Sequence, residues 1–480
     1  MPPAQELTVA RSPLPALALP AIALRNRVAI AVLALTALSF LGPSTPTYDP
    51  WSWIIWGREI LHLDLDTVRG PSWKPLPVLF TTPFALFGDV APDLWLFVAR
   101  AGAIAGVWFA FKLGRRFGGL PGGVVAALPY ALAPWTVRNA ALGNSEGLLV
   151  ALALAGIDRH LDGRTRASFL CALGAALLRP EVWPFVGLYG LYLLWRAPRV
   201  RALVLAGFAA LPVLWLAPEW WGSGDPLRAM HRAQNPRASS PAFADEPVRV
   251  VLEQFNLMLT PVFWAGLAAL GVALLIRRPP RRDLLVVGGL ALAALALVAE
   301  VAIMTADGGF SGNIRYLVMP AAALWVVAGT GVGWLVRAVL DEEAIRGGPL
   351  AVGLAVAAGI FFTAPTWTTL PIDRIALDFQ ADLNDSLPSA VARAGGRERL
   401  LACGRPYTGP FQVPIVAWHL GVHAKRVRLE PRRPAVVFRA RSNPGATVTP
   451  DLAPLGGEAA VRTLVATPDW RIVGACRGAG

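Results

Sequence analysis

The sequence is dominated by long apolar runs that are separated by short arginine-bearing segments. A helix of about 20 apolar residues crosses the roughly 30 Å hydrocarbon core of a bilayer, and a helix satisfies its own backbone hydrogen bonds there. We therefore predict a polytopic α-helical membrane protein with about eleven transmembrane helices, several of them short. The predicted spans are residues 28–41, 94–111, 120–135, 146–157, 167–178, 182–195, 202–216, 251–276, 284–304, 316–335 and 350–364.

The composition agrees with this class and excludes others. Only 16% of the residues are charged, against roughly 25% in a soluble domain. The formal net charge is +13, but the arginines flank the apolar runs, so we do not expect nucleic acid as a partner. Three cysteines exclude a disulfide-rich scaffold, and the five histidines lack the spacing of metal ligands. We predict no cofactor, and a need for a divalent metal is doubtful.

The orientation follows from the arginines, because short cytoplasmic loops carry an excess of Lys and Arg. Alternate loops carry this excess, which predicts a cytoplasmic N-terminal segment (1–27), a transmembrane domain (28–365) and an extracytoplasmic C-terminal domain (366–480). We expect a multi-pass protein of the plasma membrane whose first run is an uncleaved anchor. The loops assigned to the cytoplasm contain Arg25 and Arg27; Lys112, Arg115 and Arg116; Arg159, Arg164 and Arg166; Arg196, Arg199 and Arg201; Arg277, Arg278, Arg281 and Arg282; and Arg337 and Arg346.

The first outer loop, residues 42–93, is rich in tryptophan, which favours the membrane interface. Residues 50–61 predict an amphipathic helix lying along the membrane surface, because their tryptophans oppose Arg58 and Glu59. Residues 75–87 predict a second juxtamembrane or re-entrant helix that is too short to cross the membrane.

The tail has a soluble composition and predicts a small α/β domain. Outside the cytoplasm, Cys403 and Cys476 either form a disulfide or remain two buried thiols, and both alternatives stay open. The predicted elements are a helix over 375–394 and strands over 400–403, 426–429, 435–440 and 471–476.

Several polar side chains lie at the depth of the membrane, where each costs on the order of 2.5–3.5 kcal/mol and usually faces a cavity. Asn144 and Glu146 begin one predicted span, Arg179 and Glu181 form the tip of a hairpin, and Arg315 precedes another span. All of them are assigned to the outer half of the membrane. We therefore predict an outward-opening cavity that suits a lipid phosphate, since cations bind phosphate through charge-assisted hydrogen bonds.

Several short motifs stand in these regions: Tyr48-Asp49-Pro50, Gly57-Arg58-Glu59-Ile60, Trp73-Lys74-Pro75-Leu76, Leu86-Phe87-Gly88, Ala176-Leu177-Leu178-Arg179-Pro180-Glu181 and Asn313-Ile314-Arg315-Tyr316-Leu317. With these motifs the chain resembles the C-type (GT-C) membrane glycosyltransferases, and especially the protein O-mannosyltransferases and lipid A aminoarabinose transferases. The resemblance covers roughly residues 28–200 and the neighbourhood of Arg315, but not the tail.

The resemblance implies transfer of a sugar, with inversion, from a polyprenyl-phosphate donor to an unidentified extracytoplasmic glycan, lipid or protein. Asp49 would be the general base, and Arg58 and Lys74 would hold the phosphate of the leaving carrier. Many relatives have a second acid after the first, but this chain has Pro50, so a metal held by an acidic pair is not expected. The other predicted substrate-binding residues are Asn144, Glu146, Arg179, Glu181, Arg315 and Tyr316.

Each of these side chains is also compatible with a purely structural role. Asp49 before Pro50 is a common helix start, and Arg58 is compatible with the solvated face of a surface helix. Lys74 is also placed to reach lipid headgroups, and Arg179 to pair only with Glu181. An alternative function is a transporter or flippase of a lipid-linked sugar, and a third is a noncatalytic membrane scaffold.

Overall fold

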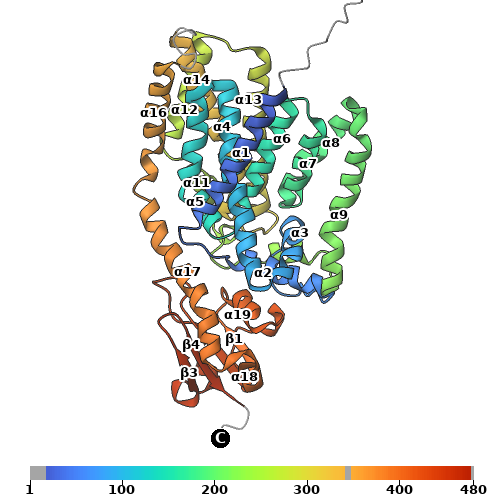
Figure 1. Ribbon diagram of the computed structural model, residues 1–480, viewed down its shortest axis with the longest axis vertical. Helices are drawn as coiled ribbons and strands as arrows, with labels where there is room; N and C mark the ends of the chain where they lie inside the picture. Colours follow the sequence, from blue (N-terminus) through green and yellow to red (C-terminus); the bar gives the residue numbers. More distant parts are fainter. Residues whose placement is uncertain (1–17, 341–347, 477–480) are drawn as a thin grey trace, which may run out of the picture.

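The computed structural model describes residues 18–340 and 348–476, which form a bundle of helices with a small sheet at one end (Figure 1). The helices of the bundle are α1 (Ala18–Ser39), α2 (Tyr48–Leu61), α3 (Pro75–Phe84), α4 (Ala91–Leu132), α5 (Pro134–Ala141), α6 (Glu146–Leu161), α7 (Thr165–Ala176), α8 (Trp183–Arg196), α9 (Arg201–Ser223), α10 (Arg228–Ala233), α11 (Pro247–Leu259), α12 (Phe263–Ile276), α13 (Arg281–Ala306), α14 (Val318–Val339) and α16 (Pro349–Thr363).

Each predicted apolar run lies on helical structure, although the number of spans is not confirmed. By length and composition, five helices of the described residues could cross a membrane, or up to seven if each of two bent pairs is one span. The run 251–276 is not the single helix that we predicted, because α11 and α12 are bent by 81°. The break contains Thr260, whose φ of 61° no α-helix accommodates. An uninterrupted apolar run gives no sign of such a break.

Helix α4 contains the two runs 94–111 and 120–135, and it reverses between them. Gly119 at the reversal has a φ of 68°, which glycine adopts without a steric penalty. A Cβ atom built on Gly114 would lie 2.6 Å from the Cβ of Ala126. Contact between residues twelve positions apart is impossible in a straight helix, so the two runs pack side by side, as two separate spans would.

The centre of the bundle is a close contact between α4 and α14, and α14 is almost entirely buried. Gly118 and Gly122 of α4 face Gly329 and Gly333 of α14, and a Cβ on Gly122 would lie 2.8 Å from the carbonyl oxygen of Gly329. A spacing of four puts both glycines of a pair on one helix face, where they let two backbones touch. Small residues therefore set the distance between these helices.

The C-terminal segment forms a four-stranded sheet with three helices packed near it (Figure 1). The sheet has the order β1-β2-β4-β3, in which β1 and β2 are parallel and the other pairs are antiparallel. The elements are α17 (Leu370–Arg393), α18 (Gly396–Cys403), β1 (Arg405–Thr408), α19 (Val413–Leu420), β2 (Ala435–Arg439), β3 (Arg462–Ala466) and β4 (Arg471–Ala475).

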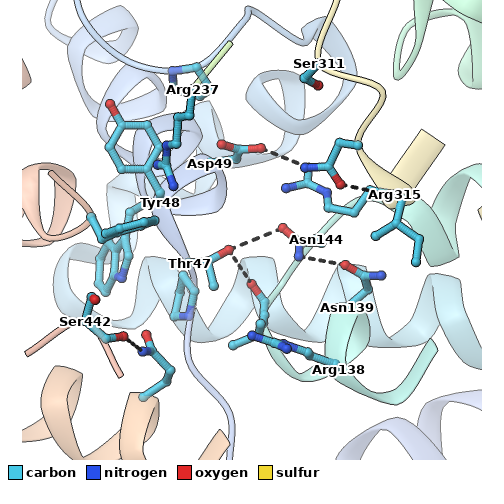
Figure 2. Close-up of a pocket in the computed structure, with 18 of the residues that line it drawn as sticks. Thr47, Tyr48, Asp49, Arg138, Asn139, Asn144, Arg237, Ser311, Arg315 and Ser442 are labelled. Carbon is cyan, nitrogen blue, oxygen red and sulfur yellow. Dashed lines mark hydrogen bonds and ion pairs between the residues drawn. The ribbon is translucent and has the colours of Figure 1, made fainter. Parts of the chain in front are cut away.

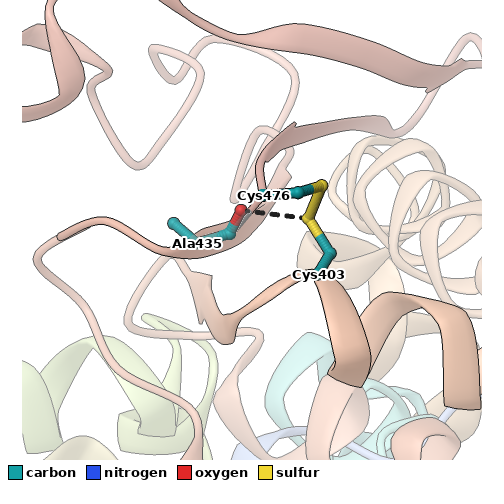
Figure 3. The surroundings of a disulfide bond; sticks show 3 residues. All are labelled: Cys403, Ala435 and Cys476. Atoms are coloured by element: carbon teal, nitrogen blue, oxygen red, sulfur yellow. Dashed lines mark hydrogen bonds between the residues drawn. A yellow bond between two sulfur atoms is a disulfide. The ribbon is translucent and has the colours of Figure 1, made fainter. Parts of the chain in front are cut away.

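The tail predictions were confirmed in part. The helix over 375–394 and the last two strands are present as α17, β2 and β4, but residues 400–403 end helix α18 and the strand starts at Arg405. Periodicity cannot separate helix from strand in so short an apolar run. Residues 426–429 contribute only an isolated bridge at Arg428, and β3 and α19 were not predicted. Cys403 and Cys476 form a disulfide (Figure 3), while Cys171 is free.

Helix α2 is present as predicted, but it is buried between the bundle and α19, and its position along the membrane surface stays a prediction. Its Trp53 and Trp56 are 0% and 1% exposed. Arg58 donates hydrogen bonds to the carbonyl oxygens of Trp418 and Val422 at 3.4 and 3.0 Å. The amphipathic pattern identifies a polar face of this helix, but it does not tell whether water or another part of the chain covers that face.

Candidate active site

A cavity of about 1050 Å³ lies where the helical bundle meets the C-terminal segment (Figure 2). Its walls come from the start of α2, the segment before α3, helix α5 and the loop after it, residues 232–241 and residues 311–316. The remaining wall comes from residues 376–444. The cavity thus depends on packing of segments that are far apart in the sequence.

The described residues around this cavity carry mostly positive charge. The only acidic residue among those that line it is Asp49. Six cationic residues line it, namely Lys74, Arg138, Arg179, Arg232, Arg237 and Arg315. A concave site with charge of one sign concentrates ligands of the opposite sign, so this cavity favours an anion.

Asp49 lies in the first turn of α2 and points into the cavity. One of its carboxylate oxygens, Oδ2, accepts a hydrogen bond from Nη2 of Arg315 at 2.9 Å. The residue before α2 is Thr47, which is therefore the N-cap. Asp49 is already helical, so its interpretation as an N-cap is wrong.

Glu146 does not line the cavity, but its buried carboxylate binds two arginines that do, Arg179 and Arg315. Its side chain is fully buried, and its Oε1 accepts hydrogen bonds from Arg179 and, at 3.0 Å, from Nε of Arg315. A buried carboxylate without partners would cost several kcal/mol. This pairing explains how Glu146 is tolerated at the start of α6 and why both guanidinium groups are fixed.

Lys74 completes this group of cations. It is 7% exposed, and its Nζ donates a hydrogen bond to Oγ of Ser145 at 3.1 Å. Burial, followed by the positive charge of Arg179, lowers the pKa of the Lys74 ammonium group to about 7. An anion that bound here would restore the charged form.

Neighbouring side chains fix the positions of these groups. The guanidinium of Arg179 lies 4.5 Å from the ring centre of Tyr316, a cation–π arrangement. Asn144 donates to Oδ1 of Asn139 at 2.8 Å and accepts a hydrogen bond from Thr47 at 3.3 Å (Figure 2). The loop before α6 is thereby tied to the start of α2.

The structure brings together most, but not all, of the residues that the sequence singled out. Glu181 does not line the cavity and lies 3.7 Å from Nη1 of Arg179. Arg58 is also outside it and instead binds the C-terminal segment. Glu146 lies behind the lining. The predicted residues that do line the cavity are Asp49, Lys74, Asn144, Arg179, Arg315 and Tyr316.

Three lining arginines were missed by the sequence analysis, namely Arg138, Arg232 and Arg237. A signal was present for two of them. The predicted topology places residues 217–250 outside, yet this segment carries four arginines, against the usual depletion of positive charge from outer loops. An outer loop that retains cations is a candidate for ligand binding.

Comparison with known proteins supports the fold by structure rather than by sequence. No protein-family model matches the chain, and no curated protein matches it. The crystal structure of ArnT from Cupriavidus metallidurans bound to undecaprenyl phosphate superposes with a TM-score of 0.53 at 14% identity, over 96% of this chain and 99% of that one. Its apo structure gives a TM-score of 0.52 at 14% identity, over 95% and 98%.

An oligosaccharyltransferase from Archaeoglobus fulgidus, solved with zinc and sulfate, matches with a TM-score of 0.43 at 14% identity, over 83% of this chain and 62% of that one. The agreement with ArnT extends over nearly the whole of both chains. It therefore includes the C-terminal segment, which the sequence resemblance did not cover. The chain therefore has the same fold as ArnT from Cupriavidus metallidurans, in agreement with the fold that the resemblance of its outer-loop motifs predicted.

Proposed function

We propose that this protein is a membrane glycosyltransferase that moves a sugar from a polyprenyl-phosphate donor to an extracytoplasmic acceptor. The observation that carries the proposal is a cavity in which one carboxylate, Asp49, faces six cations. The fold adds support, because the ArnT structure that shares it is bound to undecaprenyl phosphate. The bilayer then supplies the donor, and the protein works in the plasma membrane with its C-terminal segment outside.

The donor phosphate binds to Lys74, Arg179 and Arg315. These three cations act together on one side of Asp49, since Arg179 and Arg315 share Glu146 and the charge of Arg179 acts on Lys74. As the bond between the sugar and the phosphate breaks, negative charge grows on the phosphate oxygens. Cations fixed in advance stabilise this charge without reorganising.

Asp49 is the general base. The acceptor hydroxyl oxygen attacks the anomeric carbon while its proton passes to the Asp49 carboxylate, and the phosphate leaves with the bonding electron pair. Attack on the face opposite the phosphate inverts the configuration of the anomeric carbon. The ion pair with Arg315 holds Asp49 beside the phosphate site, so the hydroxyl that gives its proton to Asp49 is held close to the carbon from which the phosphate leaves.

The proposal is tested with the purified full-length protein and a panel of polyprenyl-phosphate sugars, by measuring release of polyprenyl phosphate. Asp49→Asn removes the base with almost no change of volume and should lower turnover at least about 100-fold. Its melting temperature and its affinity for undecaprenyl phosphate show whether the variant is folded. Glu253→Gln, at an exposed position of α11, is the matched control.

Three outcomes are distinguishable. Loss of turnover in a folded Asp49→Asn variant supports the assignment. Equal activity of the variant and the wild type would remove Asp49 from the mechanism. A wild type that consumes no donor, yet carries lipid-linked sugars across liposome membranes, would replace the transferase by a transporter.

A further inference from the structure

The wall that the C-terminal segment contributes to the cavity contains no charged residue. We call it the C-terminal wall; its residues are Ala376, Gln380, Leu383, Asn384, Phe411, Gln412, Ile415, Ser442, Asn443 and Pro444. Residues 376–444 include sixteen Asp, Glu, Lys and Arg residues, so the segment is not poor in charge. All sixteen are kept out of this wall, whereas the rest of the lining contains six cationic residues.

Hydrogen bonds fix the amide side chains of this wall in place. The indole N–H of Trp51 donates to Oδ1 of Asn384 at 3.0 Å, and Nδ2 of Asn384 donates to the backbone oxygen of Gln380 at 2.7 Å. The side-chain amide of Gln380 in turn donates to the backbone oxygen of Ser442 at 2.7 Å. The chain of bonds begins at Trp51, two residues after Asp49, so the wall is held directly beside the proposed base.

Hydrogen-bonding groups remain free in this arrangement. Among the described residues, Oε1 of Gln380, the hydroxyl of Ser442 and Nδ2 of Asn443 have no hydrogen-bond partner, although Oδ1 of Asn443 accepts from Gly445. Together they offer an acceptor, a donor and a group that serves as both. A fixed set of uncharged donors and acceptors suits a ligand with many hydroxyl groups.

The wall and the phosphate-binding cations lie on different sides of the base. In Figure 2, Ser442 and Arg315 lie on opposite sides of Asp49. A displacement at the anomeric carbon needs the leaving group on one face of the sugar and the incoming hydroxyl on the other. With the phosphate at Lys74, Arg179 and Arg315, the C-terminal wall is left for the acceptor, and Arg237 is the cation that contacts this wall.

We propose that the C-terminal wall is the acceptor site and that the acceptor is an uncharged, hydroxyl-rich saccharide. The inference rests on the proposed function and adds the chemical class of the acceptor to it. The rival class is an anionic acceptor, which would use Arg232 and Arg237 on another part of the lining. The guanidinium of Arg237 is already stacked 4.0 Å from the ring centre of Phe411.

The test separates binding from turnover. Binding of methyl α-mannoside and short neutral mannooligosaccharides is measured by calorimetry on the full-length protein with undecaprenyl phosphate present, and the same sugars carrying a 6-phosphate are compared. Turnover is measured with the donor that the panel identifies. A triple variant combines Gln380→Met, Ser442→Ala and Asn443→Ala. A double arginine variant combines Arg232→Ala and Arg237→Ala. The control is Ser389→Ala on the exposed part of α17.

The triple variant should raise both the Kd and the KM of the neutral acceptor about tenfold, as expected for three lost hydrogen bonds to uncharged groups. The KM of the donor and the melting temperature should change little, and the control should behave as the wild type. The inference is overturned if only phosphorylated sugars bind and the double arginine variant abolishes that binding, or if the folded triple variant is unchanged. If neutral sugars bind but no donor is turned over, the proposed glycosyltransferase function is rejected, whereas the saccharide site at the C-terminal wall is retained.

Discussion

Arg315 and Asp49 are 266 positions apart in the sequence, and their side chains form an ion pair with Nη2 and Oδ2 at 2.9 Å. The same guanidinium binds the buried carboxylate of Glu146 through Nε. Arg315 therefore connects the proposed base to the side of the cavity that is proposed to hold the phosphate.

Replacing Arg315 by Ala should lower kcat/KM at least about 100-fold, because both the orientation of Asp49 and a charge at the phosphate are lost. The double variant with Arg315→Ala and Asp49→Asn should raise the activation free energy by much less than the sum of the increases in the two single variants, since the two groups act as a unit. Arg249→Ala, which breaks only exposed ion pairs on α11, is the control. Additive effects would show that Arg315 and Asp49 work independently.

The affinity for the lipid phosphate should fall as the pH rises above about 7. The pKa of Lys74 is about 7, so at higher pH the free protein must take up a proton to offer the ammonium group. The second ionisation of a phosphate monoester, near pH 6, is complete in this range. The Kd for undecaprenyl phosphate, measured from pH 7 to 9, should rise by up to about tenfold per pH unit.

Lys74→Arg supplies the control for this pH dependence, because a guanidinium stays charged throughout the range. Its Kd should be nearly flat between pH 7 and 9. The same steep dependence in this variant would mean that another group titrates.

The free energy of unfolding should fall between about pH 4.5 and 7 because of Glu59, which lies where α2 meets the C-terminal segment. Burial raises the pKa of Glu59 from 4.5 to about 7, although hydrogen bonds from the backbone N–H of Asp66 and from His423, at 2.7 Å, oppose this rise. The folded state binds the proton of the Glu59 carboxyl group more tightly than the unfolded state does. The contribution of this proton to the free energy of unfolding is therefore fully present below pH 4.5 and is lost as the pH rises through 7.

Glu59→Gln removes this titration while keeping the hydrogen-bonding shape of the side chain. The melting temperature of the wild type should therefore fall relative to that of the variant as the pH is raised from 5 to 7.5. Parallel pH curves for the two proteins would contradict the assignment to Glu59.

Gly329→Val should destabilise the bundle by more than about 2 kcal/mol, because a Cβ there would lie 2.8 Å from the backbone nitrogen of Ala126. Gly289→Val in α13 is a matched control, since no atom lies within 4 Å of its Cβ position. Both changes put the same β-branched residue into a helix, so a difference in melting temperature in detergent reports packing alone. Equal melting temperatures would argue against the α4–α14 contact.

Removing the disulfide with Cys403→Ser and Cys476→Ser should destabilise the C-terminal segment by about 2–4 kcal/mol, because the bond closes a loop across 73 positions. Limited proteolysis should then cut this segment faster, whereas Cys171→Ala should leave it resistant. Mass spectrometry of non-reduced peptides should find residues 403 and 476 linked. Finding both as free thiols would show that the bond does not form.

The sequence alone indicated the class of this protein and several of the charged residues that line the cavity. Apolar runs and arginine placement indicate membrane helices, because a span needs about 20 apolar residues and a helix satisfies its own backbone hydrogen bonds in the bilayer. Arg179 and Arg315 stood out because charge near the membrane is costly and is kept where it has a use, whereas Asp49 and Lys74 stood out only through the resemblance of the outer-loop motifs. The resemblance of the outer-loop motifs also predicted a fold that agrees with the one shared with ArnT.

Only the tertiary structure decided which of these groups meet. Arg58 has the same chemistry as Arg179, yet it binds carbonyl oxygens of the C-terminal segment and is absent from the cavity. The C-terminal wall was not predictable, because its amide groups come from α17 and from loops whose neighbours are set by long-range packing. Local sequence fixes what each helix face offers, but the fold decides whether solvent, lipid or another part of the chain covers it.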